Sequence, residues 1–168
     1  MPPENRLEEP LHWRDEPRPG DPSAVTRIVR ATDFFNEEEE AIARELAEER
    51  LARGPASGYE FLFAERGERA VGYACYGRIG GTRESWDLYW IAVEPTEQGR
   101  GLGRQLLAQT EARVRAAGGG RLYVETSGRP SYATTRDFYV RMGYALEATL
   151  ADFYAPGDAK CIYAKRLG

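Results

Sequence analysis

The sequence is short of histidine and cysteine, and it has no long apolar run. Its 168 residues include one histidine, His12, and two cysteines, Cys75 and Cys161. Because His12 lies in a segment rich in Pro, Glu, Arg and Asp, we expect it to take no part in catalysis, which excludes histidine-based triads. Both cysteines lie in apolar, strand-like runs, so we expect buried thiols in a reducing compartment rather than a disulfide.

The sequence also lacks a large excess of one sign of charge, because 23 Lys and Arg residues nearly balance 27 Asp and Glu residues, for a formal net charge of −4. A mildly acidic chain is a poor match for nucleic acid, which favours a basic surface. Hydrophobic residues make up 42% of the chain, which excludes wholesale disorder. The sequence has neither an apolar stretch of about 18 residues nor a signal-peptide pattern at its start. We therefore expect a cytoplasmic protein with no membrane contact.

The stretch from Asp87 to Ala117 combines a strand, a glycine loop and a helix. Residues 87–93 are rich in aromatic and β-branched residues, which is typical of a strand, and Pro95 ends it. A triple glycine at 118–120 is expected to end the helix. The apolar side of that helix is given by residues at helical spacing, namely Leu102, Leu106, Leu107, Thr110 and Val114.

The loop between this strand and helix has glycine at positions 99, 101 and 103. Glycine allows a positive φ, and amides that enter the first turn of a helix have no partner within the helix. Together with Arg100 and Arg104, such amides predict a site for an anion, most naturally phosphate. The alternative is a tight connection without a ligand. A dinucleotide fingerprint is disfavoured, because Arg104 stands where its third glycine belongs.

The remaining segments alternate between strands and helices. We expect an irregular N-terminal arm over residues 1–23 and one domain over residues 24–168. Asn36 and Glu39 form a capping-box pattern that begins a helix ending near Arg53. Further strands are expected at 25–31, 59–65, 70–79, 121–126, 144–153 and 160–167, with a short helix at 131–142. The order β-α-β-β-β-α-β-α-β-β predicts an α/β (α+β) fold, with a mixed, mostly antiparallel central sheet of about seven strands and helices on both faces.

Three segments of the sequence resemble the GNAT superfamily of acyl-CoA-dependent N-acyltransferases. They are Ile91–Pro95, Gln98–Gly103 and the run Phe138–Tyr144. The loop in that family has the form Gln/Arg-x-x-Gly-x-Gly/Ala, and its three specified positions are met here by Gln98, Gly101 and Gly103. The order of elements from about residue 25 to 167 also fits. The resemblance implies a GNAT-like sheet and acetyl-CoA as the acyl donor, with no metal.

The resemblance also implies which residues contact the donor. Main-chain groups of Ile91 and Val93 would pair with the pantetheine arm, and the loop amides would hold the pyrophosphate. Tyr132 stands where the family often has an asparagine that contacts pantetheine, and Ser131 or Arg136 could replace that contact. The full set of expected cofactor-binding residues is Ile91, Ala92, Val93, Gln98, Gly99, Arg100, Gly101, Leu102, Gly103, Arg104, Tyr132 and Arg136.

Acyl transfer to an amine requires a neutral amine, yet a lysine-like amine is neutral in roughly one part in 2,500 at pH 7. Asp87 occupies a strand position where some family members carry a glutamate base. It could remove the proton, attract a cationic substrate, or be a solvated carboxylate. Glu84 and Glu125 are the other candidate carboxylates. Tyr139 falls where many members place a tyrosine facing the thioester sulfur, and it could stabilise the developing thiolate.

These residues predict an N-acetyltransferase that moves an acetyl group from acetyl-CoA to a primary amine by direct attack in a ternary complex. The alternative is a non-catalytic module that binds or senses acyl-CoA. The acceptor could be a small molecule or a peptide, because fold and cofactor motif do not define that half of a site. Edge-strand pairing through the C-terminal hairpin could make a homodimer.

Overall fold

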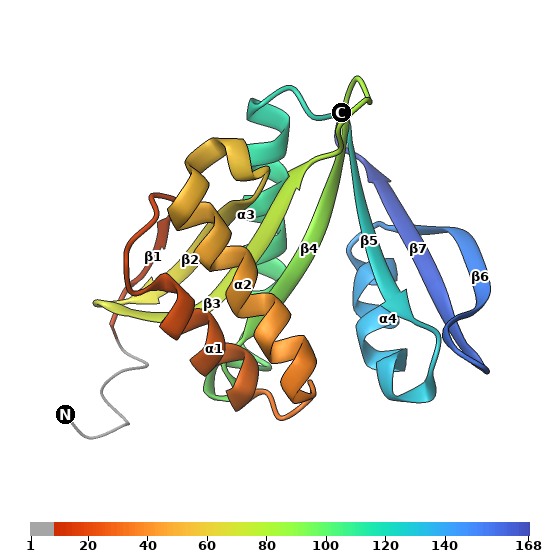
Figure 1. Ribbon diagram of the computed structural model, residues 1–168, viewed down its shortest axis with the longest axis horizontal. Helices are drawn as coiled ribbons and strands as arrows, with labels where there is room; N and C mark the ends of the chain where they lie inside the picture. Colours follow the sequence, from red (N-terminus) through yellow and green to blue (C-terminus); the bar gives the residue numbers. More distant parts are fainter. Residues whose placement is uncertain (1–8) are drawn as a thin grey trace. The chain divides into compact units, whose positions relative to one another are not determined.

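The structure is a computed structural model that describes residues 9–168 (Figure 1). It has a seven-stranded sheet in the order β1-β2-β3-β4-β5-β7-β6, flanked by helices. The pairs β1–β2, β2–β3, β5–β7 and β6–β7 are antiparallel, and β4–β5 is parallel. The expected mixed, mostly antiparallel sheet is therefore confirmed.

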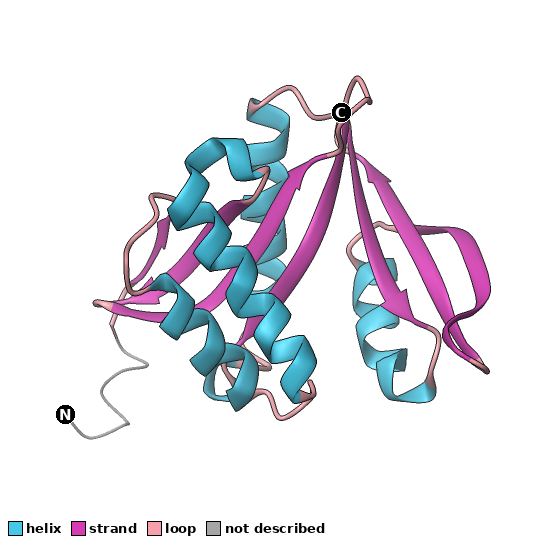
Figure 2. Ribbon diagram, viewed as in Figure 1, coloured by secondary structure: helices cyan, strands magenta, loops and turns pink. Residues whose placement is uncertain are grey.

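Figure 1 shows the order of the helices and strands by colour, and Figure 2 distinguishes helices from strands. Short 3₁₀ turns lie at Gly54–Ser57, Pro95–Glu97 and Pro130–Tyr132. The main elements are β1 (Leu11–Arg14), α1 (Asp21–Ala31), α2 (Glu37–Arg53), β2 (Glu60–Arg66), β3 (Arg69–Arg78), β4 (Ser85–Val93), α3 (Leu102–Ala116), β5 (Arg121–Ser127), α4 (Ala133–Arg141), β6 (Ala145–Ala155) and β7 (Asp158–Arg166).

The strand expected at residues 25–31 is wrong, because these residues belong to helix α1. Pro22 stands in the first turn, where its missing N–H costs no hydrogen bond. Val25, Ile28 and Val29 are buried, and their spacing is that of one helix face. The β-branched residues suggested a strand, but the packing of this face decides the structure.

Within the arm expected over residues 1–23, the structure has strand β1 and the start of α1. Trp13 pairs with Ala64 of β2, so β1 is the first strand in the order of the sheet. His12 lies in this strand, with its Nε2 3.4 Å from Glu65 Oε1. Residues 1–8 lie outside the described residues. That residues 24–168 form a single acetyltransferase domain stays a prediction.

The capping box of α2 and the hairpin after it are confirmed. The Asn36 side chain accepts a hydrogen bond from the Glu39 amide at 2.8 Å, and the Glu39 carboxylate accepts one from the Asn36 amide. Gly54 ends α2 with a φ of 62°. Strands β2 and β3 pair from Glu60↔Tyr76 to Arg66↔Arg69.

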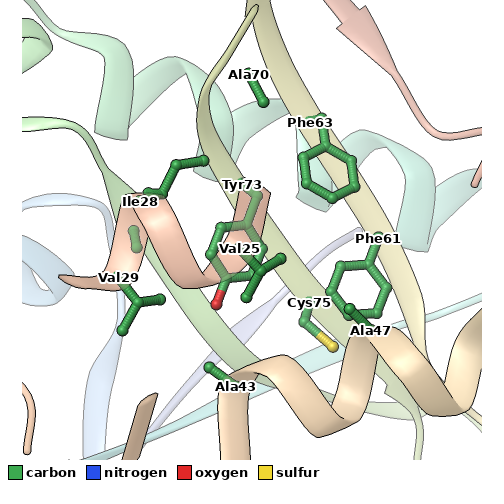
Figure 3. Close-up of a cluster of buried hydrophobic side chains, with 11 residues drawn as sticks. Val25, Ile28, Val29, Ala43, Ala47, Phe61, Phe63, Ala70, Tyr73 and Cys75 are labelled. Carbon is green, nitrogen blue, oxygen red and sulfur yellow. The ribbon is translucent and has the colours of Figure 1, made fainter. Parts of the chain in front are cut away.

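The described chain divides into two compact units, and β4 and α3 each contribute residues to both of them. The first unit consists of the residues up to Gly77 and Trp90–Thr110. In it, α1 and α2 cross β2 and β3 (Figure 1). Figure 3 shows the core between them, in which Phe61 and Phe63 stack on Tyr73 at centroid distances of 6.1 and 5.9 Å. On the other face, Leu102 packs with Ala64 and Val71.

The second unit consists of Arg78–Tyr89 and Glu111–Gly168. Buried Glu111 accepts a hydrogen bond from the Tyr144 hydroxyl at 2.8 Å and from Lys165 Nζ at 2.9 Å. These bonds fix α3 to the segment between α4 and β6 and to β7, and they satisfy a carboxylate that would otherwise be costly to bury. Strand β6 stands last in the order of the sheet, and nearly all of its residues are exposed.

Cys75 and Cys161 are free and buried, as expected. Among residues 9–168, none of the helices is long and apolar enough to cross a membrane.

Candidate functional site

Near the end of β4, the main-chain N–H and C=O groups of Ile91 and Val93 are directed away from the neighbouring strand β3. The Glu94 amide donates to Val71 O at 2.8 Å, so the main-chain N–H of Glu94 is directed toward β3. Because successive residues of a strand direct their N–H and C=O groups to opposite sides, those of Ile91 and Val93 are directed away from β3. The register of β4 with β5 runs from Ser85↔Arg121 to Leu88↔Val124 and ends before both residues.

The loop after β4 has the conformation that its glycines require. Gly99 and Gly101 have φ values of 77° and 80°, a region that other residues rarely adopt. The first bond of α3 runs from the Gln105 amide to Gly101 O at 3.1 Å. The amides of Leu102, Gly103 and Arg104 precede this bond and have no partner within the helix. They carry partial positive charge at the helix N-terminus, as an anion site needs.

The side chains around this loop add to its polarity. Gln98, Arg100 and Arg104 are exposed, whereas Leu102 is buried and anchors the start of α3. Gln98 Nε2 donates to Val93 O at 3.4 Å, which holds the loop against the end of β4. The expected cofactor residues of β4 and the loop therefore form one continuous segment within the first unit.

Two buried carboxylates before the loop were missed by sequence reasoning. Glu94 and Glu97 are 6% and 1% exposed, and both line a cavity of about 860 Å³ in the first unit. Arg27 and Arg69 pair with Glu94, and Arg66 pairs with Glu97. Charged residues in a loop are usually solvated, so the sequence holds no signal for their burial.

Asp87 lies in the second unit beside a carboxylate and an ammonium. Burial and the charge of Glu125 raise the pKa of Asp87, and the charge of Lys160 opposes that rise. Asp87 pairs in the register with Tyr123 of β5, and Glu125 follows Tyr123 two residues later on the same strand. Lys160 Nζ lies 2.9 Å from Glu125 Oε2 and 4.2 Å from the centroid of the Phe153 ring. A carboxyl with a raised pKa is better matched to proton transfer than an ordinary aspartate.

The third candidate carboxylate, Glu84, stands just before β4. A Cβ added to Gly120 would lie 2.6 Å from the Glu84 carboxyl, so this side chain lies against the turn that precedes β5. Its main-chain oxygen accepts hydrogen bonds from the Gly120 and Arg121 amides. The structure thus brings Asp87 and Glu125 together with Lys160, and it places Glu84 at the Gly120 turn.

Tyr139 is buried on α4 in an aromatic cluster of the second unit. Its ring lies 5.6 Å from that of Tyr144 and 6.4 Å from that of Tyr163. Burial raises the pKa of the Tyr139 phenol above its usual range. Tyr139 therefore keeps its proton at neutral pH and can donate a hydrogen bond.

Arg136 and Tyr132 lie at the start of α4. Arg136 Nη1 donates to the main-chain oxygens of Ser127 and Arg129, at 2.9 and 2.8 Å, and orders the turn after β5. The Arg129 guanidinium lies 5.7 Å from the centroid of the Tyr132 ring. The roles expected of both residues toward a cofactor stay predictions. Within residues 9–168, no group of three or more His, Cys, Asp or Glu side chains could hold a metal ion.

The anion-binding geometry of this loop, on a mixed sheet of this order, agrees with what the resemblance to acyl-CoA-dependent acyltransferases implies. The sequence model of the "Acetyltransferase (GNAT) family" matches residues 23–144. This chain belongs to the GNAT acetyltransferase family.

Three known proteins illustrate the relationship. Blasticidin-S acetyltransferase of Streptomyces morookaense is 34% identical over 115 residues, which are 64% of this chain and 73% of that protein. A crystal structure of an acetyltransferase assigned to the GNAT family, from Desulfovibrio desulfuricans, has a TM-score of 0.93 and 46% identity over 95% of this chain and 100% of its own. The yncA structure from Salmonella typhimurium, with acetyl-CoA, has a TM-score of 0.72 at 21% identity, covering 94% of both chains.

The relatives differ in how much of their length is matched. This chain spans 28% of the length of an uncharacterized protein of Mycobacterium leprae (strain TN), ML0378, with 29% identity over 107 residues.

Proposed function

We propose that this chain transfers the acetyl group of acetyl-CoA to a primary amine by direct attack in a ternary complex. The observation that carries the proposal is the run from Ile91 to Arg104, in which two strand residues turned away from β3 lead into glycines of positive φ and a helix N-terminus. An extended thioester arm would pair with the strand residues, and its diphosphate would bind the amides.

The reaction needs one bond formed, one broken and one proton moved. The nitrogen lone pair of the neutral amine attacks the thioester carbonyl, a C–N bond forms, and the C–S bond breaks. The nitrogen loses a proton, and the sulfur departs as a thiolate, which takes up a proton from solvent afterwards. Asp87 is the proposed acceptor of the amine proton, directly or through water, because its raised pKa brings it closer to that of an amine.

Tyr139 is the proposed donor to the sulfur. Its phenol stays protonated, so it can stabilise the charge that develops on the thiolate by a hydrogen bond. Glu125 and its partner Lys160 flank Asp87, and we propose that Glu125 helps to attract a cationic amine. The name of blasticidin-S acetyltransferase supports a small-molecule acceptor, and peptide amines remain the alternative.

The second candidate function is a module that binds acyl-CoA without chemistry. Release of free thiol from acetyl-CoA, measured with a panel of small amines and peptide N-termini, separates the two. The proposal expects thiol release that depends on the amine and falls in the variants Asp87→Asn and Tyr139→Phe. A protein that binds acetyl-CoA but releases no thiol with any amine is the binding module.

A further inference from the structure

We infer that Arg66 is a positioning residue for the diphosphate-binding loop, Gln98–Arg104, and that it acts through Glu97. The inference rests on the function proposed for that loop. Arg66 Nε lies 2.6 Å from Glu97 Oε1, and Arg66 Nη2 lies 3.0 Å from Glu97 Oε2. Two parallel bonds between a planar guanidinium and a carboxylate fix orientation as well as distance.

Glu97 is the residue that directly precedes the loop. It ends the 3₁₀ turn Pro95–Glu97, and Gln98 follows it directly. The main-chain oxygen of Glu97 accepts a hydrogen bond from the Arg100 amide at 3.4 Å, which closes the first turn of the loop around Gly99. The orientation of Glu97 therefore determines where the next amides point.

Ion pairs hold this segment on its cavity side. Glu94, Thr96 and Glu97 line the cavity of about 860 Å³. Glu94 pairs there with Arg27 and Arg69, and Glu97 pairs with Arg66. Arg66 is itself held, because its Nη1 donates to the main-chain oxygen of Glu9 at 2.8 Å. The contact thus connects the end of β2 rigidly to the base of the loop.

This arrangement predicts an effect that depends on the diphosphate. Replacing Arg66 by Lys keeps the positive charge but loses the two-pronged bond, so Glu97 can turn. The loop amides then lose their alignment with a diphosphate. A donor without a diphosphate, S-acetylpantetheine, makes no use of those amides and should be unaffected by their misalignment.

The test compares kcat/KM for acetyl-CoA and for S-acetylpantetheine with one amine acceptor. In Arg66→Lys we expect the ratio of the two values to fall on the order of tenfold, through a higher KM for acetyl-CoA with kcat nearly unchanged. The matched control is Arg50→Lys, because Arg50 is as buried as Arg66 and pairs with Glu60, away from the loop. Its ratio should stay at the wild-type value.

The double variant Arg66→Gln with Glu97→Gln leaves no unpaired buried charge and keeps the test valid if the single variant unfolds. An equal loss for both donors, or an unchanged ratio in a folded variant, overturns the inference. If the wild-type protein transfers no acetyl group, the proposed chemistry fails separately. Calorimetric titration of the same variants with CoA and with pantetheine then tests the role of the Arg66–Glu97 pair alone. The affinity for CoA must fall relative to the wild type, while the affinity for pantetheine stays the same.

Discussion

Lys160 of β7 and Glu125 of β5 form an ion pair, with Nζ 2.9 Å from Oε2, next to Asp87. The register explains the contact, because Glu125 pairs with Ile162, and Lys160 lies two residues along on the same face of the antiparallel ladder. Lys160 is 15% exposed in its side chain, so its charge is only partly screened by water. Burial raises the pKa of Asp87 most, the charge of Glu125 adds to that rise, and the charge of Lys160 opposes it.

The first prediction concerns the pH dependence of catalysis. If the ionised Asp87 carboxylate accepts the amine proton, kcat/KM falls as the pH drops through its pKa. Lys160 lowers that pKa, so Lys160→Met should raise it and move the acid limb of the pH–rate profile to higher pH. Arg166→Met, which removes an exposed cation further along β7, should leave the limb in place. An acid limb that stays fixed, or moves to lower pH, would exclude Asp87 as the titrating group.

Asp87→Asn should separate activity from stability. Because burial raises the pKa of Asp87, its charged form is disfavoured in the folded state, and this penalty is present above the unfolded pKa. The variant should therefore be at least as stable as the wild type at pH 7, while kcat/KM falls by about 100-fold. Thermal melting and initial rates measure the two effects. Loss of both together would make Asp87 a structural residue.

Tyr139→Phe should lower kcat by about 100-fold, because the thiolate loses its hydrogen-bond donor. The ring contacts with Tyr144 and Tyr163 remain, so the melting temperature should change little. Tyr144→Phe offers the opposite pattern. It removes the 2.8 Å bond to buried Glu111 and should cost about 1–3 kcal/mol of stability with kcat retained. A fully active Tyr139→Phe enzyme would disprove the proposed role.

A pair of glycine variants separates backbone strain from ligand binding. Gly101 and Gly81 have φ values of 80° and 75°, and an added Cβ meets nothing within 4 Å at either position. Changing either residue to Ala should cost about 1–2 kcal/mol of stability through the left-handed conformation. Only Gly101→Ala should also raise the KM for acetyl-CoA. Equal KM values in the two variants would show that the loop does not bind the donor.

The core contains one polar group whose removal should stabilise the protein. The Tyr73 hydroxyl is buried and, among the described residues, has no hydrogen-bond partner. Figure 3 shows it among apolar side chains that include Val25 and Ala43. Tyr73→Phe should raise the free energy of unfolding by about 1 kcal/mol, which is roughly 2–4 °C in melting temperature. A lower melting temperature would indicate that the hydroxyl is satisfied.

The sequence predicted the elements whose signals are local. Asn36 with Glu39 predicts a helix start by its own hydrogen bonds, and the glycines at 99 and 101 predict a turn because few other residues adopt a positive φ. By contrast, α1 is defined by burial at Val25, Ile28 and Val29 against elements distant in sequence. A short segment rich in β-branched residues does not reveal which of its faces will be covered.

For the candidate site, too, the sequence predicted only the features that are defined by local signals. The anion loop follows from its own sequence, whereas the Arg66–Glu97 pair joins residues 31 positions apart, and neither residue has an apolar neighbour pattern that indicates burial. Strand β1 is similar, since its four residues become a strand only by pairing with β2. Long-range pairing of charges and of short strands is decided by the fold as a whole, so local patterns do not report it.

The most direct test of the account is calorimetric titration of the wild-type protein with CoA and with pantetheine, which lacks the diphosphate. The account predicts one saturable site for CoA and much weaker binding of pantetheine, with the difference reduced in Gly101→Ala. Absence of heat with millimolar CoA, or equal affinity for the two ligands, would contradict the claim that the amides after β4 bind a diphosphate.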